Sequence, residues 1–175
     1  MANPRKMLIV ADNHEDRQPI EDLIHIYEGE VDHMLHLGDS MFPDLDKVWQ
    51  QMIPIKGNND SGEGYIEQTV VCLGEAKIFA THGHQLDVGK SRGKLAEKAK
   101  ENNCQFACYG HTHEAKVEEI DGVLVINPGS ISQPRGPVLR KLYAILSIDE
   151  DRHYQLEYYD HNHREVKELS ASGEF

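Results

Sequence analysis

Short polar motifs follow apolar runs at five places along this 175-residue chain. Each motif offers carboxylate, amide or imidazole groups near the point where a buried strand is expected to end. The motifs are A-D-N-H with Asp12 and His14, G-D with Asp39, G-N with Asn58, T-H-G-H with His82 and His84, and G-H-T-H with His111 and His113. Such side chains are costly beside an apolar core unless a partner receives them. The pattern therefore predicts that the motifs meet around a ligand.

The residue types indicate that this ligand is a metal centre. Oxygen and nitrogen donors without thiolate suit manganese, iron, zinc, nickel or cobalt. In an extended D-x-H or H-x-H segment the first and third side chains project to the same side, so each pair can face one centre. Asp39 follows Gly38 in a predicted turn, where its carboxylate can approach two ions closely. We therefore expect Asp39 to bridge two metal ions.

Strand-length and helix-length apolar patterns alternate early in the chain, and hairpin signals follow later. Strands are expected at residues 7–11, 33–37, 53–56, 66–73, 76–81, 104–109, 117–120, 123–126, 141–148 and 154–159. Helices are expected after Pro19, after Pro43 and over residues 90–102. This order predicts an α/β fold, a two-sheet β-sandwich flanked by helices. We expect a single domain over residues 1–165 and a polar tail over residues 166–175, with the motifs at the carboxyl ends of the strands.

Composition excludes several classes of function. A formal net charge of −12 argues against nonspecific nucleic-acid binding, which needs clustered Lys and Arg. The three cysteines contain no C-x-x-C pair, which is typical of reduced thiols. No window is long and apolar enough to predict a membrane span or a signal peptide. We therefore expect a cytoplasmic protein that does not contact membranes.

The ordered motifs, followed by N-P-G-S at residues 127–130, resemble the calcineurin-like metallophosphoesterase superfamily, and most of all its small YfcE-type phosphodiesterases. The resemblance implies a binuclear centre of two divalent ions, with manganese expected first and iron, nickel, zinc or cobalt as alternatives. It assigns the first ion to Asp12, His14, Asp39 and His113, and the second ion to Asp39, Asn58, His82 and His111. The same resemblance implies the αββα fold.

The expected reaction is hydrolysis of small phosphodiesters. Two divalent ions about 3.5–4 Å apart can share a hydroxide and clamp phosphoryl oxygens during in-line attack on phosphorus. Asp39 is expected to orient the hydroxide, His84 to contact the substrate or leaving group, and Arg135 to contact phosphate. Asn59 stands where many larger members of the superfamily have a histidine that protonates the leaving group.

Other interpretations stay open. The same superfamily includes phosphomonoesterases, protein phosphatases and nucleotide pyrophosphatases, and a eukaryotic retromer subunit of similar fold is a non-catalytic, protein-binding scaffold. A homodimer is a further alternative. Three residues or segments receive a structural interpretation: His36 is expected to pack in its strand, Asp60 to orient Asn58 or form a turn, and D-H-N-H at residues 160–163 to be solvated surface.

Overall fold

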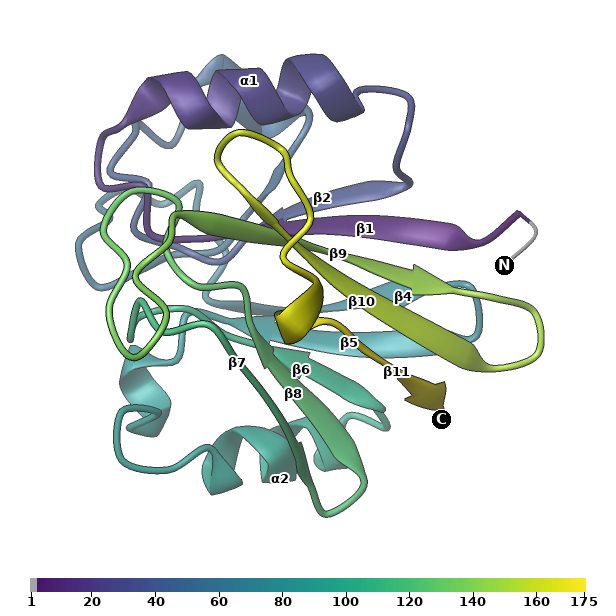
Figure 1. Ribbon diagram of the computed structural model, residues 1–175. Helices are drawn as coiled ribbons and strands as arrows, with labels where there is room; N and C mark the ends of the chain where they lie inside the picture. The colour runs from purple at the N-terminus through teal and green to yellow at the C-terminus, as the bar shows by residue number, and fades with distance from the viewer. Residues whose placement is uncertain (1–2) are drawn as a thin grey trace.

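Two β-sheets lie face to face in the computed structural model of the chain, which describes residues 3–175. Helix α1 (Arg17–Tyr27) covers the outer face of one sheet, and helix α2 (Gly93–Glu101) covers the outer face of the other (Figure 1). The predicted two-sheet sandwich flanked by helices is therefore confirmed.

The first sheet has six strands in the order β11-β10-β9-β1-β2-β3. Their bounds are β1 (Arg5–Val10), β2 (His33–His36), β3 (Ile53–Pro54), β9 (Leu142–Ile148), β10 (His153–Asp160) and β11 (Ala171–Glu174). Strands β1, β2 and β3 pair in parallel, whereas β9, β10 and β11 are antiparallel to their neighbours. The chain therefore leaves β1, β2 and β3 at the same edge of the sheet.

The second sheet has five strands in the order β4-β5-β6-β8-β7. Their bounds are β4 (Gln68–Leu73), β5 (Ala76–Thr81), β6 (Phe106–Cys108), β7 (Lys116–Ile120) and β8 (Val123–Asn127). Strands β5, β6 and β8 pair in parallel, so the segments after them also leave from one edge. The motifs that follow β5 and β6 therefore start side by side.

Apolar side chains fill three layers, one between the two sheets and one between each sheet and its helix. The space between the sheets is the largest, and Ile9, Leu35 and Ile78 are fully buried in it. Helix α1 buries Ile20 and Leu23, and α2 buries small and branched side chains at helical spacing, Leu95, Ala96 and Ala99. Neither helix has the length and apolar run that a membrane span requires, and residues 3–175 contain no other candidate.

The helix predicted after Pro43 is the clearest difference. Only a short 3₁₀ turn forms there, η1 (Lys47–Gln50), and the Asp46 side chain accepts a hydrogen bond from Val48 N at its start. Since β3 begins at Ile53, too few residues remain for a longer helix. Leu45, which precedes this turn, is 91 % exposed.

The chain ends in further secondary structure. Two other 3₁₀ turns are η2 (His84–Leu86) and η3 (Lys167–Leu169), and η3 leads into β11, which pairs antiparallel with β10. The predicted tail over residues 166–175 thus contains η3 and β11. The predicted domain boundary at residue 165 stays a prediction.

The D-H-N-H segment at residues 160–163 is the predicted solvated surface only in part: His161 and Asn162 are exposed, whereas Asp160 is buried and His163 is half-buried. Asp160 is only 8 % exposed, and its carboxylate accepts hydrogen bonds from the backbone N–H groups of Asn162 and Arg164. The segment is a turn that the carboxylate closes after β10. The His163 Nδ1 atom lies 3.0 Å from the hydroxyl of buried Tyr143. The segment resembles the first motif in sequence, but its contacts stabilise a turn and do not form a ligand group.

Candidate metal centre

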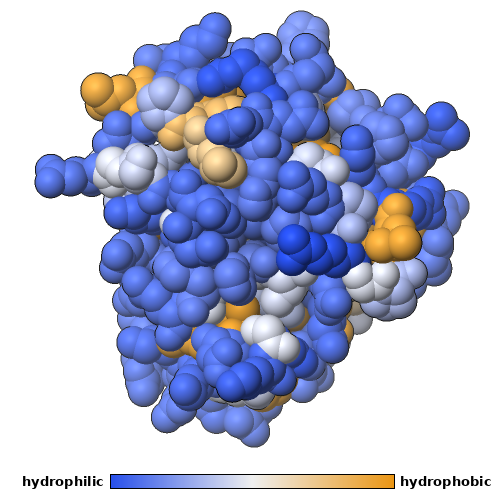
Figure 2. All heavy atoms as spheres, turned by 90° about the vertical axis from the view of Figure 1, so that its left-hand side faces the viewer, coloured by the Kyte–Doolittle hydropathy of each residue, from blue (hydrophilic) through white to orange (hydrophobic). Residues whose placement is uncertain are grey.

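The polar motifs gather where the strands end, on the left-hand side of Figure 1. Backbone hydrogen bonds join their loops: Asp12 N donates to Gly38 O, and Gly110 N donates to His82 O, each over 3.0 Å. Figure 2 looks directly at this side of the molecule, whose surface is mostly hydrophilic. The fold therefore brings the five motifs to one polar face, as the sequence predicts.

Asp12, His14 and His113 form the first ligand group. The Nε2 atoms of His14 and His113 are 3.1 Å apart. Asp12 Oδ1 lies 4.0 Å from the His14 nitrogen and 3.8 Å from the His113 nitrogen. One oxygen and two nitrogen atoms thus converge closely enough to bind a single cation.

A second ligand group lies beside the first. Asn58 Oδ1 is 3.1 Å from both His82 Nε2 and His111 Nδ1. Asp39 Oδ2 lies 3.3 Å from His82 Nε2 and 3.7 Å from His14 Nε2. The Asp39 carboxylate therefore lies between the two groups.

The electrostatics of the site fit a cation. Asp12 Oδ1 is buried and has no hydrogen-bond partner among residues 3–175. Burial raises the pKa of Asp12 to about 7, and the nearby charge of Asp39 adds to this rise. Burial opposes ionisation of Asp39 too, but hydrogen bonds from His82 and Asn59 hold its pKa well below the ordinary value. A buried carboxylate oxygen without a partner is costly unless a cation binds it.

The histidines differ in charge. Burial lowers the pKa of His111 and of His113, so both imidazoles are neutral and can donate a lone pair to a metal. Burial also disfavours the charged form of His82, but the carboxylates of Asp39 and Asp12 outweigh it and raise the pKa of His82. A metal ion would take the place of the proton that the carboxylates favour on His82.

Left-handed backbone, rather than extended backbone, aims most of these side chains. Five of the seven expected ligands have positive φ: Asp12 (57°), His14 (44°), Asp39 (58°), His111 (72°) and His113 (63°). In T-H-G-H, Gly83 takes the positive φ, at 103°. The prediction that D-x-H and H-x-H face the centre from extended segments was therefore wrong. Such conformations cost energy and cluster at functional sites.

Asp60 holds the loop that carries Asp39. Its carboxylate accepts backbone N–H groups from Asp39, Met41 and Gly57 over 2.7–2.8 Å. Asn59 then donates to both Asp39 oxygens, through its backbone N and its side-chain Nδ2, each over 2.9 Å. Of the two roles expected for Asp60, the turn is confirmed, because Asp60 N donates to Gly57 O over 3.2 Å. The other role differs, because the Asp60 carboxylate orients Asp39 rather than Asn58.

Gly57 packs against Asp39, which yields a test by substitution. A Cβ atom at residue 57 would lie 2.0 Å from Asp39 Oδ1 and 2.4 Å from Asp39 N. Gly57→Ala is expected to destabilise the chain by about 2–4 kcal/mol, because the Asp39 loop must move. Urea unfolding measures the loss. Gly89→Ala is the control, since a Cβ there meets nothing within 4 Å; equal stability of the two variants would contradict the prediction.

Two further predicted residues lie at the rim. The ring of His84 is 5.4 Å from that of His82 and 6.2 Å from that of His111, centroid to centroid, and its buried Nδ1 has no hydrogen-bond partner among residues 3–175. Arg135 N donates to His113 O over 2.9 Å, and the positive charge of Arg135 contributes to the lowered pKa of His113. Both residues therefore border the ligand groups without belonging to them.

Sequence reasoning missed residues that support the centre. Ser130 Oγ and Ser132 Oγ both donate to the main-chain oxygen of Asp12, over 2.7 and 3.0 Å. The N-P-G-S motif at residues 127–130 drew attention to this loop, but it did not predict the contact with Asp12. His36 is fully buried as predicted, and it also lies within hydrogen-bond distance of the Asn13 side chain, at 2.7 Å. An imidazole in an apolar strand was the available signal for that contact.

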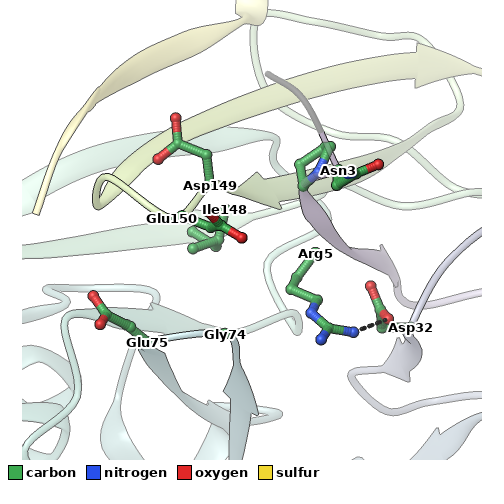
Figure 3. Close-up of a pocket in the computed structure, with 9 residues that line it drawn as sticks. Asn3, Arg5, Asp32, Gly74, Glu75, Ile148, Asp149 and Glu150 are labelled. Carbon is green, nitrogen blue, oxygen red and sulfur yellow. Dashed lines mark hydrogen bonds and ion pairs between the residues drawn. The ribbon is translucent and has the colours of Figure 1, made fainter.

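A cavity of about 600 Å³ lies elsewhere, at the opposite end of β1 (Figure 3). Asp32, Glu75, Asp149 and Glu150 line it, and the one arginine that lines it, Arg5, donates to Asp32 over 3.3 Å. An acidic lining repels phosphate. The cavity therefore does not compete with the ligand groups as a site for anionic substrates.

A third cluster of candidate ligands, Asp149, Asp151 and His153, lies at the β9–β10 hairpin. Here Asp149 accepts hydrogen bonds from the backbone N–H groups of Asp151 and His153. These bonds are those of a hairpin turn closed by its own carboxylate. The cluster is explained without a metal.

Comparisons with known proteins agree with this geometry. The profile of the calcineurin-like phosphoesterase superfamily domain matches residues 6–151. The chain is 32 % identical to the probable metallophosphoesterase YsnB of Bacillus subtilis, over 93 % of this chain and 95 % of YsnB. It is 33 % identical to the phosphodiesterase MJ0936 of Methanocaldococcus jannaschii, over 71 % of this chain and 82 % of that protein.

Solved structures share the fold. A conserved uncharacterized protein from Streptococcus pneumoniae, described as a predicted phosphoesterase, superposes with a TM-score of 0.93 at 33 % identity and covers 100 % of both chains. Vps29 from Cryptosporidium parvum has a TM-score of 0.76 at 21 % identity and covers 98 % of both chains. For YfcE from E. coli the TM-score is 0.67 at 20 % identity, over 97 % of this chain and 98 % of YfcE. At these lower identities the likeness concerns the fold alone.

Proposed function

Because the chain belongs to the calcineurin-like phosphoesterase superfamily, we propose that it hydrolyses small phosphodiesters at a centre of two divalent metal ions. The observation that carries this proposal is the position of Asp39 Oδ2, 3.7 Å from His14 Nε2 and 3.3 Å from His82 Nε2. One carboxylate shared by two ligand groups suits a pair of ions. The name of the relative MJ0936, a phosphodiesterase, supports diesters over monoesters.

Each ion has four ligands in this proposal. The first is bound by Asp12, His14, Asp39 and His113, and the second by Asp39, Asn58, His82 and His111. Manganese is proposed first because of the family resemblance; carboxylate, amide and imidazole donors accept it, and they accept iron, nickel, zinc and cobalt as well. Two such ions would supply Lewis-acid charge and an activated water for attack on phosphorus.

Charge explains how an acidic protein binds an anionic substrate. The chain carries a formal net charge of −12. Asp12 and Asp39 contribute two negative charges to the centre, whereas two divalent ions contribute four positive ones. The loaded centre is therefore about two charges positive and attracts phosphate locally.

The chain's own residues then orient the reactants. Asp39 is proposed to hold the attacking water in line with the leaving group, since its carboxylate lies between the ligand groups. Asn59 donates to Asp39 and lacks an acidic proton, so His84 is proposed as the group beside the leaving oxygen. Arg135, fixed through its backbone to His113, is proposed to contact a phosphoryl oxygen.

A comparison of substrates tests the function. The manganese-loaded protein is assayed on an aryl phosphodiester, the matching aryl phosphomonoester and a dinucleotide. We expect kcat/KM to be highest for a diester, and chelation to remove the activity. Faster turnover of the monoester would replace the diesterase proposal with a phosphomonoesterase, and full activity after chelation would exclude the metal-dependent mechanism.

His84→Gln is expected to lower kcat on the diester by about 10²-fold, because one positioned acid–base group is lost. The variant keeps every proposed ligand, so calorimetric titration should still find two Mn²⁺ per chain. The conserved metal content is the control for correct folding. An unchanged kcat would exclude His84 from the reaction.

The protein-binding scaffold is the alternative. Likeness to Vps29 concerns the fold, and a fold does not determine function. Support for an enzyme comes instead from the two groups of candidate ligands that share Asp12, and from the Asp12 oxygen that has no hydrogen-bond partner among residues 3–175. The cytoplasmic location and a homodimer stay predictions.

A further inference from the structure

We propose that Asn13 and His36 form a positioning pair that fixes the Asp12–His14 loop against the Gly38–Asp39 loop and thereby sets metal affinity. This inference rests on the proposed metal centre. It concerns two side chains that are fully buried and that belong to neither ligand group. Asn13 lies between the proposed ligands Asp12 and His14 in the sequence, and His36 accepts a hydrogen bond from Gly38, the residue before Asp39.

The hydrogen bonds determine the state of His36. Its Nδ1 atom lies 3.1 Å from Gly38 N, and a backbone N–H can only donate. Nδ1 is therefore the acceptor, so the proton of the neutral ring is on Nε2. That N–H donates to Asn13 Oδ1 over 2.7 Å. Both ring nitrogens are occupied, so His36 is not available as a ligand.

The Asn13 side chain completes the link. Since its oxygen accepts from His36, its Nδ2 atom is free to donate to Asp16 O at 3.1 Å and to Ser40 O at 3.4 Å. One side chain thus contacts the loop after β1 and the loop after β2. A hydroxyl at residue 13 has one donor and cannot make all three contacts.

The two loops need such a link. Their backbones are joined by N–H groups of Asp12, His14 and Glu15, which donate to Gly38 O, Asp39 O and Ser40 O over 3.0 Å each. Asp12, His14 and Asp39 nevertheless have left-handed φ, a conformation that persists only where the surroundings impose it. The buried pair supplies contacts behind the strained residues that the backbone ladder lacks.

The pair keeps its form over the working range of pH. Burial lowers the pKa of His36 to about 3. The Trp49 ring packs edge-on against His36, with 5.5 Å between ring centroids. The imidazole is therefore neutral and confined on its apolar side.

Two matched substitutions separate positioning from packing. In His36→Gln the amide nitrogen reaches the place of Nε2 and keeps a donor for Asn13, whereas the shorter side chain in His36→Asn reaches only the place of Nδ1. Titration calorimetry of the full chain with Mn²⁺ alone is the readout. We expect about 10- to 100-fold weaker binding for His36→Asn, and recovery of most of the affinity in His36→Gln.

A double-mutant cycle adds a second readout. Asn13→Thr alone is expected to weaken Mn²⁺ binding as His36→Asn does, and the double variant to bind no more weakly than either, because both changes break one link. Ile145→Val is the control: Ile145 is buried beneath α1, so its variant should lose thermal stability and keep its Mn²⁺ affinity.

Equal Mn²⁺ affinity in His36→Asn and His36→Gln, or additive effects in the double variant, would overturn the pair. If His36→Asn does not fold, Asn13→Thr decides, because unchanged affinity in that loop variant would also overturn it. Binding of fewer than two Mn²⁺ by the unmodified chain would instead contradict the binuclear centre. The two failures are therefore distinguishable.

Discussion

Asp39→Asn is expected to lower kcat on phosphodiesters by about 10³-fold and to release at least one of the two metal ions. The amide has nearly the shape of the carboxylate but lacks the negative charge that lies between His14 and His82. Loss of the shared ligand removes several kcal/mol of charge stabilisation in the transition state, which corresponds to this change in rate. Metal content per chain and diester turnover are measured on the same preparation.

Asp160→Asn is the matched control for Asp39→Asn. Asp160 is also a poorly exposed aspartate, but it is the last residue of β10 and its carboxylate closes the turn that follows. Its variant should keep two ions and the full rate, with some loss of stability. An Asp39→Asn variant with two ions and the rate of the unmodified chain would contradict the assignment of Asp39 as the shared ligand.

Features with a regular period could be predicted from the sequence. The apolar run before Asp12 became β1, and the helical spacing of Ile20 and Leu23 became the buried face of α1. Since parallel strands place their carboxyl ends at one edge, the order of elements also placed the motifs together. Periodicity and topology were sufficient for the fold and for the gathering of the site.

Features that depend on tertiary contacts could not be predicted. The left-handed φ of Asp12 and Asp39 is uncommon outside glycine, and although Asp adopts it more often than most residues, the sequence marks neither position as a glycine would. The bond between His36 and Asn13 joins residues 23 positions apart, which no local pattern specifies. The 3₁₀ turn η1 replaced a predicted helix because β3 begins soon after it. In each case a long-range contact outweighed a local preference.

Asp12→Asn is expected to have opposite effects on stability and on metal binding. Without metal, burial raises the pKa of Asp12 from 3.8 to about 7. The folded chain therefore binds more protons at Asp12 than the unfolded chain does between about pH 4 and 7, so the Asp12 contribution to stability falls as pH rises. Asn cannot ionise, and its variant avoids this loss.

The metal-free Asp12→Asn variant should accordingly be more stable than the unmodified chain above pH 7, by about 2–4 kcal/mol, and equally stable near pH 4. Other groups act in the opposite sense: the lowered pKa of His36 makes stability rise with pH between about 3 and its ordinary value of 6.5. His36 is present in both proteins, so its contribution cancels when their free energies of unfolding are subtracted. Urea unfolding in chelator, from pH 4 to 8, measures the difference.

Added Mn²⁺ should reverse the order of stability, so that the unmodified chain becomes more stable than Asp12→Asn. The unmodified chain gains RT ln(1 + [Mn²⁺]/Kd) in its free energy of unfolding, whereas Asp12→Asn, which lacks a charged ligand in the first group, gains little. A variant that is less stable than the unmodified chain at pH 8 in chelator would contradict the burial argument. If both orders are observed, Asp12 is a carboxylate whose burial costs stability until a cation binds, which explains why an apolar strand ends at it.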